Sequence, residues 1–519
     1  MKKIAVLTFL IMAAPSVGVT SPPNCSDLDQ LLLPDIRINK ATASAGEKVE
    51  DSTPLPHGVP ARQRKALVPH CKIMGTIGDE INFELLLPNE WNGKFLMGGG
   101  GGFAGSIGSQ GRFSVNQGYA TVATDTGHQA NGIRADWAYN HLERQVNYGY
   151  LGVHRTAEAA KAIIRAYYEL PPKYSYFYGC SNGGRQAMME AQRFPEDFDG
   201  IVAGAPAHDF TGVIGGFLYN TQRIFPDRSN PTQSVITADN RRLLQSTILE
   251  QCDRLDGIED GILDDPRECT FKLSSLPKCP GGKAAPHCLT VAQHEAIAAV
   301  YDGPQNQDGQ IYPGFPFGGE NERAAWQGWI TGPSERLIEA FGEPSSQYGF
   351  GTQGFKYLVF QDPQWDYTRY DFAMFEQDTQ RLSSIADATN PNLSGLKQAG
   401  GKLLLWHGWV DAALTAYGSI DYFEAVKAHD ANVRDYFRVF MLPGVFHCAG
   451  GPGPDRVDWV KAIEDWVERD EAPERLTAFR VADNKVEMTR PLCVFPQRAV
   501  YKGSGSTNDA ASFECRDTD

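Results

Sequence analysis

Short apolar runs alternate with longer amphipathic stretches in the first 206 residues and again after residue 390. Helical spacing of apolar residues predicts helices at 156–170, 184–194 and 455–469, and the first of these carries Ala160, Ile163, Ile164 and Tyr167 on one face. The apolar runs predict buried strands at 73–87, 94–97, 119–124, 174–178, 200–204, 401–408 and 436–442. This alternation predicts an α/β fold with a doubly wound, mostly parallel sheet.

The alternation breaks between residues 207 and 389, a stretch rich in glycine, proline and aromatic residues. It is too long for a loop, so we expect an inserted domain. Its place over the strand ends predicts a lid that closes a pocket. The predicted domains are therefore a core built from residues 22–206 and 390–519, with a lid at 207–389.

The first 21 residues have the pattern of a cleaved secretory signal peptide. Two lysines precede an apolar run at 4–14, and small residues follow. The run is too short for a membrane anchor, and no later stretch is long and apolar enough to span a bilayer. The ten cysteines fit an exported chain with five disulfides. We expect a secreted or periplasmic protein.

Composition narrows the possible partners. The formal net charge is −15 and no basic patch is evident, so nucleic acids and anionic membrane surfaces are poor partners. Hydrophobic residues make up 42%, which excludes a disordered chain. The five glycines at 98–102 follow a strand, but they lack the helix and the acidic residue of a dinucleotide site, and we expect no organic cofactor.

Residues 179–183 have the pattern Gly-x-Ser-x-Gly, with Cys180 directly before Ser181. A predicted strand precedes this motif and a predicted helix follows it, which is the context of a nucleophile elbow. Without that context the motif is common and indicates only a glycine-bearing turn. Here it predicts that Ser181 is a catalytic nucleophile.

Two downstream residues complete a candidate triad, in the order acid and then histidine. Asp411 follows the strand predicted at 401–408, and His447 follows the strand predicted at 436–442. Taken alone, Asp411 could cap a helix and His447 could be a structural loop residue. A Cys180–Cys448 bridge would bring their Cα atoms to ~4.4–6.8 Å, and Ser181 would then lie beside His447.

The surroundings of the triad predict further roles. The glycine run fits an oxyanion-hole loop, with Gly99 or Gly100 donating one backbone N–H and Asn182 the other. His407 and Leu414 are expected at the substrate pocket, although for His407 a role behind Asp411 is equally consistent with the sequence. Aromatic residues of the lid are candidates for a substrate clamp, although most must form lid core: Trp326, Trp329, Phe350, Phe355 and Tyr357. Three other histidines, His128, His141 and His154, are expected to be structural.

An acidic segment lies within the predicted lid, with carboxylates at Asp253, Asp256, Asp260 and Asp264. Oxygen ligands and tight-turning glycines suit Ca²⁺. The spacing is not that of an EF-hand, and by itself it favours a solvated acidic loop. Short-range pairing of the remaining cysteines proposes Cys252–Cys269, Cys279–Cys288 and Cys493–Cys515, which leaves Cys25–Cys71.

Three segments resemble the tannase and feruloyl esterase family of α/β-hydrolases. They are WNGKFLMGGGGGFAG (91–105), GCSNGGRQAMMEAQRFPEDFDGIVAGAPA (179–207) and LLLWHGWVDAAL (403–414). The resemblance implies an α/β-hydrolase fold, hydrolysis of aromatic-acid esters such as feruloyl or galloyl esters, a triad of Ser181, Asp411 and His447, and a Cys180–Cys448 disulfide. It also implies the disulfide pairing given above.

The same resemblance implies a structural calcium site in the lid. Asp253, Asp256 and Asp260 would bind through carboxylates, and Ile258 and Ile262 through backbone oxygens. Two alternatives stay open: a peptidase or amidase on the same fold, and a non-catalytic calcium- or glycan-binding protein. The sequence does not specify the acid, the alcohol or the oligomeric state.

Overall fold

The computed structural model describes residues 24–46, 67–108 and 110–517. The predicted signal peptide lies outside these residues. Within the described part of the chain, no helix is both long enough and apolar enough to cross a bilayer.

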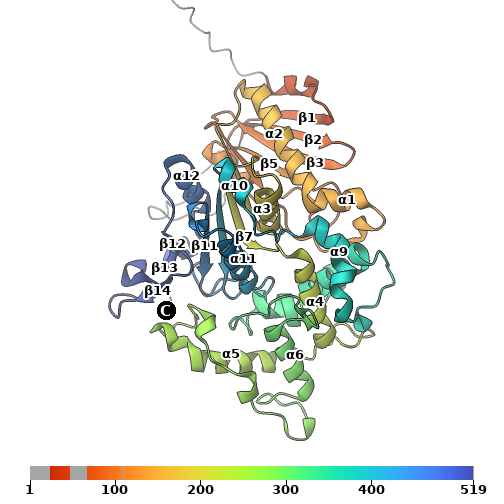
Figure 1. Cartoon of the computed structure of the whole chain (residues 1–519), viewed down its shortest axis with the longest axis vertical. Coiled ribbons are helices and arrows are strands. Elements are labelled where there is room, and N and C mark those ends of the chain that lie inside the picture. Colours follow the sequence, from red (N-terminus) through yellow and green to blue (C-terminus); the bar gives the residue numbers. More distant parts are fainter. Residues whose placement is uncertain (1–23, 47–66, 109, 518–519) are drawn as a thin grey trace, which may run out of the picture.

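A nine-stranded sheet forms the centre of the molecule (Figure 1). Its order is β1-β2-β3-β5-β4-β6-β7-β10-β11. The β1–β2, β2–β3 and β3–β5 pairs are antiparallel, and all neighbours from β5 to β11 are parallel. The strands are β1 (Ile36–Ser44), β2 (His70–Ile77), β3 (Ile81–Pro88), β4 (Lys94–Gly98), β5 (Ala120–Thr124), β6 (Tyr174–Ser181), β7 (Gly200–Pro206), β10 (Lys402–Gly408) and β11 (Phe437–Leu442). The predicted mostly parallel sheet is confirmed.

Helices cover both faces of this sheet because its central strands are apolar on both sides. In β10, Leu403 and Leu405 pack in one core with side chains of α2, α3 and α11. Leu404 and Trp406 point to the other face and pack with α12. The bounds of these helices are α2 (Gly152–Tyr168), α3 (Asn182–Arg193), α11 (Ala416–His429) and α12 (Trp459–Arg469). Two shorter helices, α1 (Leu142–Val146) and α10 (Ser394–Ala399), belong to the same part of the chain.

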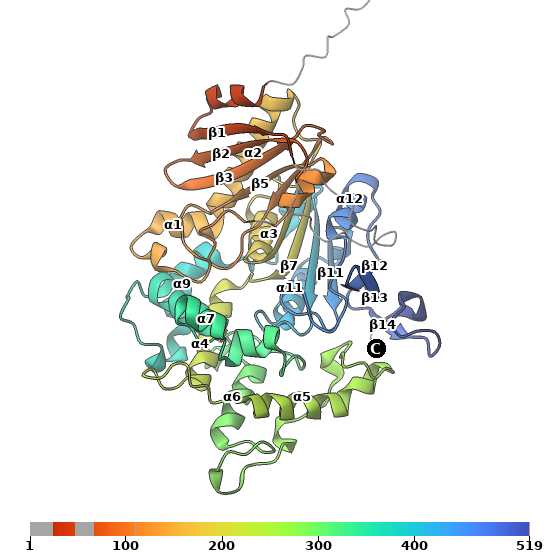
Figure 2. The same cartoon turned by 180° about the vertical axis from the view of Figure 1, so that it is seen from behind.

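The segment between β7 and β10, called the insert below (residues 207–389), is largely helical. It lies at the end of the sheet where β6 and β7 finish, and both views show it there in green to cyan (Figures 1 and 2). Its elements are α4 (Phe210–Ile224), α5 (Ala238–Cys252), α6 (Val291–Asp302), β8 (Gln305–Asn306), β9 (Gly309–Gln310), α7 (Glu335–Phe341), α8 (Ser346–Gln353) and α9 (Phe375–Ala386).

Two hairpins after α12 end the described chain, and five disulfides staple the molecule. The hairpins are formed by β12 (Arg475–Ala482) with β13 (Lys485–Cys493) and by β14 (Arg498–Tyr501) with β15 (Phe513–Arg516). The disulfides are Cys25–Cys71, Cys180–Cys448, Cys252–Cys269, Cys279–Cys288 and Cys493–Cys515. These are the pairs named from the sequence. The sequence did not predict β1, whose residues are mostly exposed and therefore form no apolar run.

Candidate active site

Ser181 stands at the tight turn between β6 and α3. Its backbone has φ 66° and ψ −126°, a left-handed conformation that costs a non-glycine residue free energy. A Cβ on Gly179 would lie 2.4 Å from the carbonyl oxygen of Gly183, and one on Gly183 would lie 2.6 Å from Oε1 of Gln110. At 179 the backbone itself leaves no room for a side chain, and at 183 a side chain would push the Gln110 amide away from Cys180; close glycines on both sides of the serine are the pattern of a nucleophile elbow.

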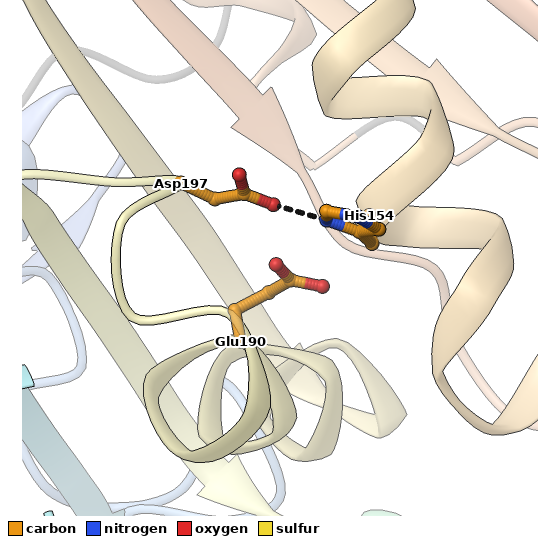
Figure 3. A group of neighbouring side chains, drawn as sticks. All are labelled: His154, Glu190 and Asp197. Carbon is orange, nitrogen blue, oxygen red and sulfur yellow. Dashed lines mark hydrogen bonds and ion pairs between the residues drawn. The ribbon is translucent and has the colours of Figure 1, made fainter. Parts of the chain in front are cut away.

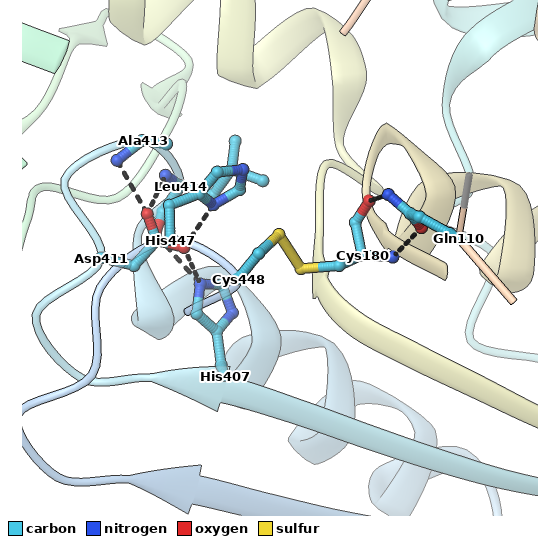
Figure 4. Close-up of a disulfide and its surroundings, with 8 residues drawn as sticks. All are labelled: Gln110, Cys180, His407, Asp411, Ala413, Leu414, His447 and Cys448. Carbon is cyan, nitrogen blue, oxygen red and sulfur yellow. Dashed lines mark hydrogen bonds and ion pairs between the residues drawn. A yellow bond between two sulfur atoms is a disulfide. The ribbon is translucent and has the colours of Figure 1, made fainter. Parts of the chain in front are cut away.

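Asp411 and His447 form a hydrogen-bonded pair next to the elbow. Nδ1 of His447 lies 2.7 Å from Oδ2 of Asp411 (Figure 4). The N–H groups of Ala413 and Leu414 donate to the other carboxylate oxygen at 2.8 and 3.0 Å. Burial by itself raises the pKa of Asp411, but its interactions with His447 and His407 outweigh burial and hold the pKa well below its usual range. The acid is thus ionised and fixed in orientation.

The Cys180–Cys448 disulfide joins the residue before Ser181 to the residue after His447 (Figure 4). The two Cα atoms are 6.0 Å apart. The side-chain amide of Gln110 also fixes the backbone of Cys180. Its Oε1 accepts from the Cys180 N–H at 2.8 Å, and its Nε2 donates to the Cys180 carbonyl oxygen at 3.3 Å. Ser181 and His447 line one cavity.

His407 is not a wall of the pocket, which corrects one expectation. It is 1% exposed and lies behind the acid, with Nε2 3.3 Å from Oδ2 of Asp411 and 3.0 Å from the Leu414 carbonyl oxygen. Its Nδ1 lies 2.7 Å from Oγ of Ser419. His407 is the last residue but one of β10, and these contacts direct its ring toward Asp411 and the loop after the strand rather than into the cavity. Leu414 does line the cavity.

The backbone donors near Ser181 differ from those expected. The Gly99 N–H donates to the Tyr178 carbonyl at 3.0 Å, and the Gly100 N–H donates to Oε1 of Gln186 at 2.9 Å. Neither is free for an oxyanion, so Gly99 and Gly100 are corrected in favour of the following residues of the run, of which Gly102 lines the cavity. Asn182 is the first residue of α3, where backbone N–H groups have no partner within the helix.

A cavity of about 250 Å³ opens above Ser181. Trp329 and Phe350 line it, whereas Trp326 and Phe355 are buried in separate cores of the insert and Tyr357 packs against one of those cores. Helix α4 was not expected at the cavity, yet it contributes four lining residues, Phe210, Val213, Ile214 and Phe217. Their i, i+3, i+4, i+7 spacing directly after β7 is a signal that could have revealed this apolar face.

The acidic segment closed by Cys252–Cys269 has the donors of a hard-cation site. Oδ2 of Asp256 and Oδ1 of Asp264 are buried without hydrogen-bond partners. Burial and then neighbouring carboxylates raise the pKa of Asp256 to about 6 and that of Asp264 to about 7. Arg490 pairs with Oδ2 of Asp260 at 2.9 Å. The uncompensated buried oxygens fit a bound divalent cation.

Another cluster lies between α2 and the loop after α3 (Figure 3). Potential ligand atoms of His154, Glu190 and Asp197 lie within 4.8 Å of one another. Nδ1 of His154 is 2.6 Å from Oδ2 of Asp197, and the ammonium of Lys161 is 3.9 Å from Oδ1 of Asp197. Both cations pair with Asp197, while burial raises the pKa of Glu190 in α3, so the cluster is explained as an ion network around Asp197 beside a neutral acid.

Comparisons with known proteins identify the family. The family model "Tannase and feruloyl esterase" matches residues 66–516. An uncharacterized esterase of Xanthomonas campestris pv. campestris is 34% identical, over 99% of this chain and 95% of its own. The mono(2-hydroxyethyl) terephthalate hydrolase of Piscinibacter sakaiensis is 32% identical, over 88% of this chain and 86% of its own. The crystal structure of feruloyl esterase B from Aspergillus oryzae matches with a TM-score of 0.81 at 26% identity, over 95% of this chain and 99% of that one. The chain therefore belongs to the tannase and feruloyl esterase family and is a carboxylic ester hydrolase with an α/β-hydrolase fold.

Proposed function

We propose that the protein is an exported serine esterase that cleaves small aromatic-acid esters through an acyl-enzyme. The observation that carries this proposal is the convergence of Ser181 and His447 on one cavity, with His447 bonded to Asp411 at 2.7 Å. A serine hydroxyl needs an adjacent base to become nucleophilic, and that base needs a partner that fixes its tautomer.

In the first step, Nε2 of His447 takes the hydroxyl proton while Oγ of Ser181 attacks the ester carbonyl carbon. Asp411 accepts from Nδ1 and stabilises the imidazolium that forms. His447 then returns the proton to the departing alkoxide, and the acyl group stays on Ser181. Water attacks the acyl-enzyme by the same route, which releases the acid and restores the serine.

The carbonyl oxygen becomes an oxyanion in both steps. The Asn182 N–H lies at the positive end of the α3 dipole, and Gly101 or Gly102 would supply a second backbone donor. A donor of this kind contributes about 3–4 kcal/mol to lowering the barrier. Because both donors are backbone groups, side-chain substitution at these positions removes neither directly.

The lining of the cavity supports an aromatic acyl group. Phe210, Phe217, Trp329 and Phe350 present ring surfaces to its interior. Aromatic rings pack against one another with a gain beyond simple area burial. Two relatives, a mono(2-hydroxyethyl) terephthalate hydrolase and a probable feruloyl esterase B, are named for esters of aromatic acids, which supports an aromatic acyl group here.

Replacement of Ser181 tests the proposal. Ser181→Ala should abolish hydrolysis of an activated aryl ester and labelling by a fluorophosphonate while the unfolding midpoint stays within a few degrees of wild type. Residual activity near that of wild type would refute the assignment. Parallel assays with an aryl ester and the matching anilide separate an esterase from the alternative peptidase, because only a peptidase would cleave both at comparable rates.

We further propose that Ca²⁺ stabilises the insert and that the protein is exported. The buried, unpaired oxygens of Asp256 and Asp264 support a cation, which Asp253, Asp256 and Asp260 would hold with backbone oxygens of Ile258 and Ile262. Such an ion would supply structural cross-linking and take no part in the ester chemistry. Five disulfides support residence in an oxidising compartment.

A further inference from the structure

Among the described residues, no lysine, arginine, aspartate or glutamate lines the cavity above Ser181. The polar groups in the lining are the side chains of Ser181, Asn182 and His447 and the indole N–H of Trp329, and Ser181 and His447 belong to the proposed triad. The rest of the lining is apolar side chain or backbone: Gly102, Phe103, Ala207, Phe210, Val213, Ile214, Phe217, Phe350, Ala413, Leu414 and Cys448. A substrate ring in this cavity meets carbon on nearly every side.

The side chain of Asn182 is not free to bind a substituent. Its Oδ1 accepts from the hydroxyl of Tyr148 at 3.0 Å and from Nε of Arg185 at 2.8 Å. Its Nδ2 donates to the Gly100 carbonyl oxygen at 3.2 Å. Since the amide is 3% exposed and bonded at both ends, it offers the substrate only its backbone N–H.

The guanidinium of Arg185, which lies behind the cavity wall, is also fully hydrogen-bonded within the protein. The guanidinium of Arg185 lies 5.4 Å from the ring centroid of Phe210, which lines the cavity. Besides Asn182, it donates to the carbonyl oxygens of Gly149 at 2.8 Å, Ala386 at 3.1 Å and Tyr148 at 2.9 Å. All three of its nitrogens therefore have protein acceptors, and the side chain is fully buried.

We propose that this cavity selects esters whose aromatic group is uncharged. This inference rests on the proposed function and narrows it. A carboxylate moved into such a cavity loses its hydration without gaining a counter-ion. Aromatic acids without a second carboxylate are the preferred acyl donors, and half-esters of aromatic dicarboxylic acids are poor ones.

The proposal separates this chain from one of its relatives. The name mono(2-hydroxyethyl) terephthalate hydrolase specifies an ester whose ring still carries a free carboxylate. Among the described residues that line the cavity here, none is a lysine or arginine that could receive that group, and the net charge of −15 further disfavours an anionic substrate. We therefore do not expect this chain to share that substrate, despite the 32% sequence identity.

One pair of matched substrates tests the selectivity on the wild-type protein. Dimethyl and monomethyl terephthalate share the ring and the scissile ester and differ by one charge. We expect kcat/KM to be about 100-fold higher for the diester, after division by two for its second ester group. The preference should persist at 0.5 M salt, because a desolvation effect is screened little whereas the long-range field of the protein is lost.

A charge placed in the wall provides the converse test. Phe350 is partly exposed at the cavity, so an arginine there can reach both the substrate and solvent. Phe350→Arg should raise the kcat/KM ratio of monoester to diester by about tenfold. Phe350→Met also removes the ring but adds no charge, and it should keep the wild-type preference. Fluorophosphonate labelling of Ser181 verifies that each variant retains an assembled site.

The outcomes distinguish the two proposals. Equal turnover of monomethyl and dimethyl terephthalate by an enzyme that labels at Ser181 overturns the selectivity and leaves the esterase proposal standing. Hydrolysis of p-nitrophenyl acetate with no turnover of either terephthalate ester overturns it as well, because the cavity then excludes aryl groups. Absence of all ester hydrolysis and of labelling overturns the proposed function, and the selectivity fails with it.

Discussion

Nε2 of His407 lies 3.3 Å from Oδ2 of Asp411, the same carboxylate oxygen that pairs with Nδ1 of His447. Two histidines thus hold one oxygen of the proposed catalytic acid, while backbone N–H groups hold the other. We expect His407→Phe to lower kcat by about 10–100-fold, since small misplacements of catalytic groups have effects of this size. KM should change little, because His407 does not line the cavity.

Two companion variants control for a packing effect at this site. His407→Gln keeps an N–H donor and should recover part of the lost kcat, and Ser419→Ala, which contacts only the far ring nitrogen, should cost less than tenfold. The pH profile of kcat/KM should also shift in His407→Phe, because the environment of the Asp411–His447 pair changes. Wild-type kcat in His407→Phe would refute a positioning role.

The disulfide next to the proposed catalytic residues Ser181 and His447 should matter more for activity than the Cys279–Cys288 disulfide. Cys180 and Cys448 are separated by 268 residues in sequence, so their link removes much freedom from the unfolded chain. The double variant Cys180→Ser/Cys448→Ser should lower kcat/KM at least 100-fold and lower the free energy of unfolding by about 2–5 kcal/mol. The matched control, Cys279→Ser/Cys288→Ser, removes a disulfide of the insert whose cysteines are only nine residues apart, and it should keep kcat/KM within about twofold. Equal activity losses in the two variants would contradict this prediction.

The sequence predicted those features that depend on local chemistry. The elbow was recognisable because Gly179 and Gly183 are packed closely around the turn at Ser181, and the central strands because both of their faces are buried. The oxyanion donors were misassigned because Gly100 bonds to Gln186, which follows it by 86 residues and whose orientation no local pattern encodes. The role of His407 was undecided for the same reason: its partners are fixed by the path of the loop after β10.

Removal of a divalent cation should destabilise the insert without abolishing the chemistry. EDTA should lower the unfolding midpoint, and Ca²⁺ should restore it, whereas Mg²⁺ should not because it requires a more rigid octahedral site. At a Ca²⁺ concentration 100 times the Kd, the gain in stability is about 2.7 kcal/mol. Asp256→Asn should lose this response, and Asp308→Asn, an exposed carboxylate of the insert, should keep it. An unchanged midpoint in EDTA would exclude a structural calcium ion.

Glu190 gives the elbow helix α3 a pH dependence of its own. It is fully buried, and burial together with the nearby charge of Asp197 raises its pKa well above the usual value. The folded state therefore retains a proton that the unfolded chain releases above about pH 4.3. Stability from this group is complete below that pH and falls as pH rises toward the folded pKa.

Glu190→Gln mimics the neutral acid, so its stability relative to wild type should improve by about 1–3 kcal/mol between pH 5 and pH 8. Urea unfolding with the disulfides intact measures this difference, and Glu143→Gln, at an exposed position of α1, should show none. The same offset from wild type at both pH values would mean that Glu190 does not hold its proton across this range.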